Sequence, residues 1–328
     1  MNELAPIYVD NNATTSLAPE VLAAMTASLA ECYGNPSSLH RVGATAKQAV
    51  MEARSKVAAL LGASPAEIVF TSSATESNHL AILGALGRDP SRRHLVTTLV
   101  EHPSTRLLLA KLVEEGVSVS EIAVDANGLP DLAAIENAIT PQTALVSMMW
   151  ANNETGAILP VAKVAAIAAA HGVLFHTDAV QAIGRVPVDM RHVSADMLSL
   201  SGHKLHAAKG IGVLFMRKSC KLPPLLWGHQ ERGRRGGTEN VASIVGLGVA
   251  AELALAGMDA DNAYVTALRQ RLELGILQQL PFATVNSKNV LRLANTSNIR
   301  FGEIDAEITL DRLDKAGICA SSGSACTA

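Results

Sequence analysis

Lys204 and Asp178 are the two side chains of this sequence that best suit covalent and proton-transfer chemistry. A lysine that forms a Schiff base must reach a carbonyl while it is partly neutral, which suits a strand end in a partly desolvated site. A carboxylate can keep a pyridine nitrogen protonated, so that the ring acts as an electron sink. Together the two residues indicate a site for pyridoxal 5'-phosphate (PLP).

Each of these residues also has an ordinary structural explanation. Lysine is usually a solvated loop residue, and Lys209 is a weaker rival to Lys204 in a glycine-rich approach to the next predicted strand. Asp178 taken alone is better explained as a helix N-cap. The occurrence of both residues at the ends of neighbouring predicted strands favours the cofactor site.

Other polar residues could complete such a site. The segment 72–76 opens an apolar-periodic helix whose N-terminus could receive a phosphate dianion, although a capping box explains the same residues equally well. His102 could stack on a cofactor ring and move protons near neutral pH, or it could be a structural loop histidine. Asn153 and Gln181 could hydrogen-bond the cofactor or the substrate, or only the loop backbone.

Cys326 is the one cysteine to which we assign a catalytic role. It lies among the small residues of the segment 321–327, which cannot pack firmly, and a thiol on a moving arm could collect an atom and deliver it elsewhere. We expect Cys319 to be buried at the end of a strand and interpret Cys32 and Cys220 as packing residues. The four cysteines show no CxxC pair and no zinc spacing.

Alternating β-rich and Ala/Leu-rich stretches between about residues 65 and 216 predict βαβ units around a mostly parallel, seven-stranded sheet flanked by helices. The predicted strands are 68–71, 95–99, 117–123, 144–149, 173–177, 197–200 and 212–216. Polar clusters follow five of them directly, at 72–76, 101–103, 152–156, 178–181 and 201–204. Ligands of open α/β sheets bind beyond the carboxyl ends of parallel strands, so we expect these clusters to meet at one edge.

The rest of the chain predicts a smaller α+β domain. Helices are expected at 245–257, 263–280 and near 306–316, with a strand at 297–301. We expect a large PLP-binding domain over residues 14–245 and a small domain formed by residues 1–13 and 246–328, which carries the Cys326 loop. The Gly- and Arg-dense stretch 228–238 is interpreted as a functional loop.

Composition restricts the class of partner. The 328 residues carry a net charge of −3, which gives no electrostatic reason to bind nucleic acid or an anionic membrane. The N-terminus lacks the basic and apolar parts of a signal peptide, and Lys163, His171 and Glu252 interrupt the Ala-rich stretches before spanning length. We therefore expect a cytoplasmic protein that acts on a small molecule.

Eight segments together resemble the NifS/IscS-type cysteine desulfurases, class V aminotransferases with the PLP-dependent transferase fold (fold type I). In order along essentially the whole chain they are 8–15, 34–38, 73–77, 101–103, 152–156, 176–181, 201–204 and 321–327. Each is a weak motif, but eight in order are very specific. The segments 229–235 and 202–206 are most similar to the nitrogen-fixation (NifS) branch.

The resemblance implies a role for each candidate residue. Lys204 would carry PLP, Asp178 would pair with the pyridine nitrogen, and His102 would stack on the ring and move protons. Gln181 would bond the phenolic oxygen, and Asn153 would contact cofactor or substrate. The other residues implied to bind the cofactor, mostly at its phosphate, are Ala74, Thr75, Ser201, Gly202, His203 and, across a homodimer interface, Thr238.

The implied reaction converts L-cysteine into L-alanine. Lys204 would assist a proton transfer, the thiolate of Cys326 would attack the substrate sulfur, and the resulting persulfide would pass to an iron–sulfur scaffold protein. Cys326 is also a candidate iron–sulfur ligand shared with that scaffold.

The sequence departs from the family pattern in three places. Family members continue for several dozen residues past the position of Ala328 and carry there an arginine that clamps the substrate carboxylate, so we expect a C-terminally truncated small domain and weaker substrate binding. A single glycine, Gly228, precedes His229 where the family tends to have two, and Ala208 replaces a usual proline.

Two other functions remain open. A selenocysteine lyase or another PLP-dependent C–S lyase would share Lys204 and Asp178, although a cysteine on a mobile arm favours persulfide transfer. A truncated PLP-binding protein with little activity would bind the cofactor but release no alanine from cysteine.

Overall fold

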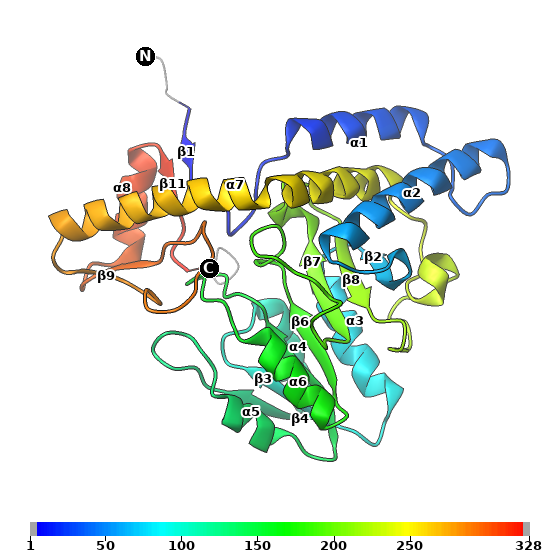
Figure 1. Cartoon of the computed structure of the whole chain (residues 1–328), viewed down its shortest axis with the longest axis horizontal. Helices are drawn as coiled ribbons and strands as arrows, with labels where there is room; N and C mark the ends of the chain where they lie inside the picture. Colours follow the sequence, from blue (N-terminus) through cyan, green and yellow to red (C-terminus); the bar gives the residue numbers. More distant parts are fainter. Residues whose placement is uncertain (1–4, 324–328) are drawn as a thin grey trace.

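The computed structural model describes residues 5–323 and contains a seven-stranded sheet at the centre of its larger part (Figure 1). In spatial order the strands are β2 (Ile68–Thr71), β8 (Gly212–Met216), β7 (Met197–Ser201), β6 (Leu174–Asp178), β5 (Thr143–Met149), β3 (His94–Thr98) and β4 (Ser118–Ile122). Only β8 runs antiparallel to its neighbours in this sheet. All seven predicted strands and the mostly parallel sheet are confirmed, with strand ends displaced by at most one residue.

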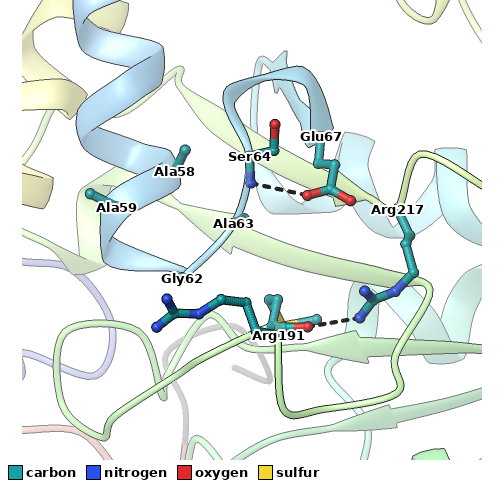
Figure 2. A pocket seen from close by; sticks show the side chains of 9 residues that line it. Ala58, Ala59, Gly62, Ala63, Ser64, Glu67, Arg191 and Arg217 are labelled. Carbon is teal, nitrogen blue, oxygen red and sulfur yellow. Dashed lines mark hydrogen bonds between the residues drawn. The ribbon is translucent and has the colours of Figure 1, made fainter.

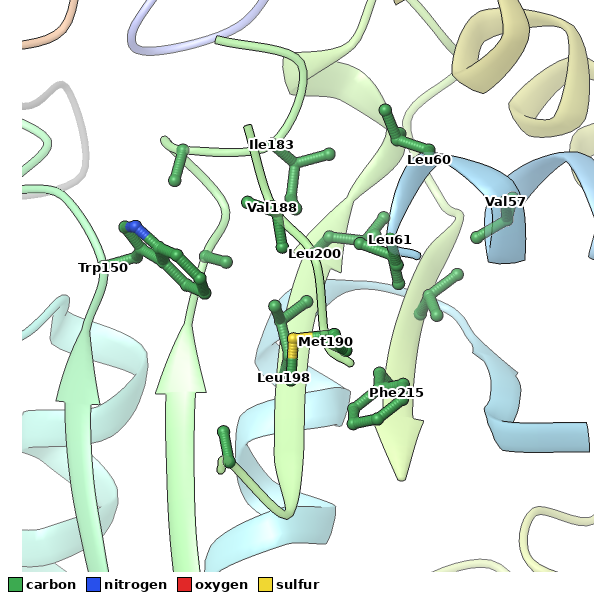
Figure 3. Packing of buried hydrophobic residues seen from close by; sticks show 14 of the residues in the cluster. Val57, Leu60, Leu61, Trp150, Ile183, Val188, Met190, Leu198, Leu200 and Phe215 are labelled. Atoms are coloured by element: carbon green, nitrogen blue, oxygen red, sulfur yellow. The ribbon is translucent and has the colours of Figure 1, made fainter. Parts of the chain in front are cut away.

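The central strands are buried on both faces because helices cover both sides of the sheet. Successive residues of one strand enter different hydrophobic clusters, as Met197 and Leu198 of β7 do. One cluster contains residues of α3 (Ala74–Arg88) and α4 (Pro103–Glu114), and the other contains residues of α2 (Arg41–Leu60) and α6 (Val161–Ala170). Figure 3 shows part of the second cluster, where Leu61, just after α2, points toward Leu200 of β7.

The remaining elements of the larger part cover the sheet or join it to the rest. The short helix α5 (Leu132–Ala138) packs near the β4 edge, and α1 (Pro19–Glu31) packs on α7 (Val241–Gln279). The first turns of α7 also approach α2 closely, because a Cβ on Gly248 would lie 2.7 Å from Cα of Ala53. Figure 1 shows α7 running past the sheet and out to the last elements of the chain.

The expectation of two helices at 245–257 and 263–280 is wrong, because α7 is continuous through both. Gly257, where the first helix was expected to end, costs a helix only about 1 kcal/mol, and residues 258–262 contain no proline that would end it. By length and composition, α7 is also apolar enough to cross a membrane, contrary to the expectation that Glu252 interrupts this stretch. Half of the most apolar stretch of α7 is buried inside the fold, so packing against the rest of the protein covers much of the apolar surface of this helix.

The C-terminal elements pair with the start of the chain. β1 (Ile7–Tyr8) lies parallel to β11 (Ile318–Cys319), while β9 (Ala283–Val285) and β10 (Ile299–Phe301) form an antiparallel pair followed by α8 (Ala306–Lys315). The strand and helix expected at 297–301 and 306–316 are confirmed with small shifts. The β1–β11 pair agrees with a small domain built from both chain ends, although the boundary at residue 245 stays a prediction.

The three cysteines within residues 5–323 differ in burial. Cys220 is buried in the cluster under α3, and Cys32 packs against the other cluster, so both serve packing as predicted. Cys319 is half-buried instead of buried, because the two-residue strand β11 pairs with β1 alone. Cys326 lies outside the described residues.

We expect Leu198→Ala to lower the free energy of unfolding by about 2–5 kcal/mol, because Leu198 is fully buried where α2 packs on the sheet. The same substitution at Leu107, which is 72% exposed on α4, should change it by less than about 0.5 kcal/mol. Urea titrations of both variants measure the two changes. Equal losses would show that this cluster does not hold the sheet and α2 together.

Candidate active site

The polar clusters after the parallel strands meet at one edge of the sheet, as expected. Asn78 of α3 links two of them, because its Nδ2 donates to Oδ2 of Asp178 at 2.8 Å and to Oγ of Ser104 at 3.2 Å. Ser104 in turn contacts Nδ1 of His102 at 2.8 Å. The loop after β5 joins the same edge, since the amide of Trp150 donates to the backbone carbonyl of Asp178.

Asp178 is a buried carboxylate whose two oxygens are both held. Oδ1 accepts from the amide of Val180 at 3.0 Å, and Oδ2 accepts from Asn78. The N-cap interpretation is wrong, because turns instead of a helix follow β6. Asp178 therefore caps a turn and keeps a fixed orientation at the end of the strand.

Lys204 is a buried lysine directly after β7. Lys204 is the last residue of a short 3-10 helix (Gly202–Lys204) and is only 7% exposed. Nζ donates to the carbonyls of Asn12 and Ala13, the latter at 2.7 Å. The solvated-loop explanation therefore fails for Lys204 but holds for its rival Lys209, which is exposed.

The N-terminal segment 10–15, which belongs to the first family motif but had no assigned role, lies over this lysine. The carbonyl of Asn12 accepts from both Lys204 and Nε2 of Gln181, the latter at 3.0 Å. The side-chain Nδ2 of Asn12 donates to the backbone carbonyl of Asn153 at 3.2 Å. The asparagine pair within the first family motif was the available signal, but the contacts with Lys204 and Gln181 use the backbone carbonyl of Asn12, which any residue type supplies.

The start of α3 offers an anion site beside β7. Ser73 caps the helix by accepting from the amide of Glu76 at 3.2 Å, which leaves Ala74 and Thr75 in the first turn, where amides have no partner within the helix. Gly212 pairs with Ser201, and a Cβ on it would lie 2.9 Å from the amide nitrogen of Ala74. A side chain on Gly212 would push β8, and with it the paired Ser201, away from the start of α3. Ser73 accepts from the amide of Glu76 and not from those of Ala74 and Thr75, so capping is compatible with phosphate binding.

Burial favours the neutral form of both His203 and His102. Burial, with help from the nearby Lys204, lowers the pKa of His203 to about 4. Burial also lowers the pKa of His102, against the opposing effect of Asp178. Nδ1 of His102 accepts from the amide of Ser104 at 3.1 Å, so the neutral ring carries its proton on Nε2.

The loop 228–238 is fixed by two ion pairs. Arg54 and Glu231 form a buried bidentate pair at 2.6 and 2.7 Å, and the amide of Phe70 in β2 donates to the same carboxylate. Arg235 forms a second bidentate pair with Glu76 of α3 at 2.8 and 3.2 Å. Thr238 is exposed at the end of this loop, and its contact with a partner subunit stays a prediction.

The last described residues lead toward this edge. Oγ of Ser321 donates to Oδ2 of Asp10 at 2.6 Å, and a Cβ on Gly323 would lie 3.6 Å from the carboxylate of Glu154. Cys326, including its predicted role as an iron–sulfur ligand, lies three residues beyond and outside the described part of the chain. Residues 5–323 contain no cluster of His, Cys, Asp and Glu suited to a metal ion.

A pocket of about 470 Å³ elsewhere in the molecule contains none of the candidate residues (Figure 2). It lies beyond the opposite end of β7, among the end of α2, Arg191 and Arg217. Arg217 donates to the carbonyls of Met190 and Val193, both at 2.8 Å, and Arg191 pairs with Asp189. Both arginines that line this pocket hold loops together, so the pocket is not a candidate for the reaction.

Glu101 is a buried carboxyl whose individual role the sequence did not reveal. Its Oε1 accepts from Oγ1 of Thr98 at 2.6 Å and from the amide of Met149 at 3.0 Å, while Oε2 is buried without a partner. Burial, assisted by the charge of Asp178, raises the pKa of Glu101 to about 8. The protonated form therefore predominates at neutral pH.

We expect the free energy of unfolding to fall by about 1.5 kcal/mol between pH 6.5 and pH 8 because of Glu101. The folded state holds this proton up to about pH 8 and the unfolded chain releases it near 4.5, so the stabilisation is complete below 4.5 and is lost as pH rises through 8. Glu101→Gln should remove this loss. Urea titrations at the two pH values, with Glu114→Gln on the exposed face of α4 as control, measure it; equal losses in wild type and Glu101→Gln would contradict it.

The donor set fits PLP group by group. The aldehyde requires an amine, which Lys204 supplies, and the pyridine nitrogen requires an acid partner, which Asp178 supplies. The phosphate requires a positive helix end with hydroxyls, which the start of α3 and Ser201 supply. These groups converge on one edge of the sheet from three separate strand ends.

Comparisons with known proteins agree with this donor set. The family model described as Aminotransferase class-V matches residues 7–328. "Cysteine desulfurase NifS" of Azotobacter vinelandii is 51% identical over 326 residues, which cover 99% of this chain and 81% of that protein. A solved "NIFS-LIKE PROTEIN" superimposes with a TM-score of 0.92 at 37% identity, covering 96% of this chain and 87% of the other.

A second solved structure, "SspA in complex with cysteine", gives a TM-score of 0.85 at 35% identity and covers 97% of this chain and 90% of the other. Sequence and structure thus give the same answer over nearly the whole chain. The chain belongs to the aminotransferase class-V family and, within it, to the cysteine desulfurases.

Proposed function

We propose that this chain converts L-cysteine into L-alanine and takes up the sulfur as a persulfide on Cys326, with PLP carried on Lys204. The burial of Lys204 at a strand end, at the same sheet edge as the buried Asp178, is the observation that carries the proposal. The relatives named cysteine desulfurase and the solved relative in complex with cysteine support this substrate.

PLP, when bound, supplies an electron sink for the carbon atoms of the amino-acid substrate. Asp178, held by Asn78 and Val180, would keep the proton on the ring nitrogen. Lys204 would take a proton from the substrate and return it, leaving the carbonyls of Asn12 and Ala13 as it moves. His102 would present its Nε2–H to the site while Ser104 holds the ring from the other side.

Cys326 would act as a thiolate toward the sulfur of the bound cysteine. A new S–S bond forms while the C–S bond breaks, and the carbon gains a proton, so that L-cysteine and the enzyme thiol become L-alanine and an enzyme persulfide. The contact between Ser321 and Asp10 supports this role, because Asp10 lies two residues before Asn12. From Gly323 the chain can extend by roughly 10 Å to Cys326.

We further propose a cytoplasmic homodimer in which Thr238 reaches the cofactor phosphate of the partner. Exposed apolar residues precede the loop 228–238, with Trp227 82% exposed beside Leu225 and Leu226, as is typical of an interaction surface. The sulfur acceptor we propose is an iron–sulfur scaffold protein, with a role in nitrogen fixation, from the resemblance to the NifS branch.

The reconstituted protein should release alanine from L-cysteine, and both Lys204→Ala and Cys326→Ala should lower that rate at least about 100-fold. Lys204→Ala should also lose the visible absorption band of bound PLP, whereas Cys326→Ala should keep it. Alanine, enzyme-bound sulfane sulfur and the absorption spectrum are measured in parallel.

Lys209→Ala and Cys32→Ala are the matched controls, and both should behave as wild type. A normal absorption band without alanine would contradict desulfuration and leave a PLP-binding protein. Undiminished alanine release by Cys326→Ala would instead favour a C–S lyase that needs no persulfide.

A further inference from the structure

Arg185 is a half-buried arginine beside Lys204 to which the proposed reaction gives no role. It follows β6 by seven residues, and its Nη1 donates to Oε1 of Gln181 at 2.5 Å and to the backbone carbonyl of Gln181 at 3.1 Å. Nη2 approaches the backbone carbonyl of Lys204 at 3.5 Å. No carboxylate among residues 5–323 forms an ion pair with it.

The chemistry of the guanidinium determines which way the Gln181 amide points. A guanidinium has five donors and no acceptor, so the atom of Gln181 that faces Arg185 must be the oxygen. Turning the amide over would place two N–H donors against each other. Although burial lowers the pKa of Arg185 to about 10, the group is still charged at neutral pH.

The fixed amide connects Arg185 to the lysine through shared acceptors. With its oxygen on Arg185, Gln181 must direct Nε2 to the opposite side, where it donates to the carbonyl of Asn12 at 3.0 Å. The same carbonyl accepts from Nζ of Lys204. One N–H of Nε2 is used in this bond, and the amide has a second.

We propose that Arg185 is a positioning residue that holds Gln181 with its amide nitrogen toward the cofactor, so that Gln181 acts as a donor to the phenolic oxygen of PLP. The inference rests on the proposed function, because it requires PLP on Lys204. The surrounding fold holds Arg185 in place, because Nδ2 of Asn262 in α7 donates to its backbone carbonyl at 2.8 Å. The preceding Gly184 packs directly on Leu205, so the turn has little freedom to move.

A donor at the phenolic oxygen has a measurable consequence. It stabilises the more negative form of the PLP–lysine linkage and therefore lowers the pH at which the linkage loses its proton. Five charged or titratable groups besides Arg185 act on Lys204 or on its neighbours and are the same in every variant compared. They are Asp178, Glu101, His102, His203 and Lys209.

The test follows the visible absorption of PLP bound to the full chain across pH, without cysteine, in wild type, Arg185→Met, Gln181→Leu and the double variant. Arg185→Met should raise the midpoint pH, at which half of the PLP–lysine linkage has lost its proton, by about one pH unit. Gln181→Leu should raise the midpoint similarly. In the Gln181→Leu background, Arg185→Met should shift the midpoint by less than half of the shift that it causes in wild type. Arg185→Lys, which keeps a donor and the charge, should restore most of the wild-type midpoint.

Arg191→Met, which removes an exposed arginine remote from the site, should leave the midpoint unchanged, and thermal melting should show that every variant is folded. Equal shifts from Arg185→Met in both backgrounds would overturn the proposal, because Arg185 would then act by its charge alone. No shift in either background would make Arg185 purely structural. A wild type without a visible band would overturn the proposed function as well, which separates the two failures.

Discussion

A buried amine must find hydrogen-bond acceptors, and the way Lys204 satisfies this requirement organises the rest of the molecule. Its acceptors are the carbonyls of Asn12 and Ala13, so the N-terminal segment must lie across the end of β7. That segment continues backward into β1, which pairs with β11, and Asp10 holds Ser321. One buried nitrogen therefore links the sheet, the first described residues of the chain and the segment that leads to Cys326.

The site carries few charges for its number of titratable groups. Burial favours neutral His102 and His203, and it keeps the proton on Glu101 near neutral pH. Lys204, Asp178 and Arg185 remain as the groups that set the electrostatic potential, and each is fixed by hydrogen bonds to the backbone or to an amide. In a partly desolvated site, the effect of each such charge is larger than it would be in water.

Patterns local in sequence predicted the sheet and most of the site. Apolar runs such as 143–149 are buried along their whole length, and the polar residues after them lie together because parallel strands end at one edge. Contacts between distant residues could not be predicted in this way, as with Asn78 and Asp178, which are 100 residues apart. The break expected after Gly257 was wrong because a single glycine costs a helix only about 1 kcal/mol, which the packing of α7 can offset.

The pairing of β1 with β11 bears on how the protein is made. The seven strands of the large sheet are complete at residue 216, so this part can assemble while the chain still emerges from the ribosome. The contact between Asp10 and Ser321 spans 311 residues, which means that β1 can pair only after β11 has been made. During synthesis β1 therefore stays without its partner strand, and Asp10 without Ser321, until the ribosome has made about 310 further residues.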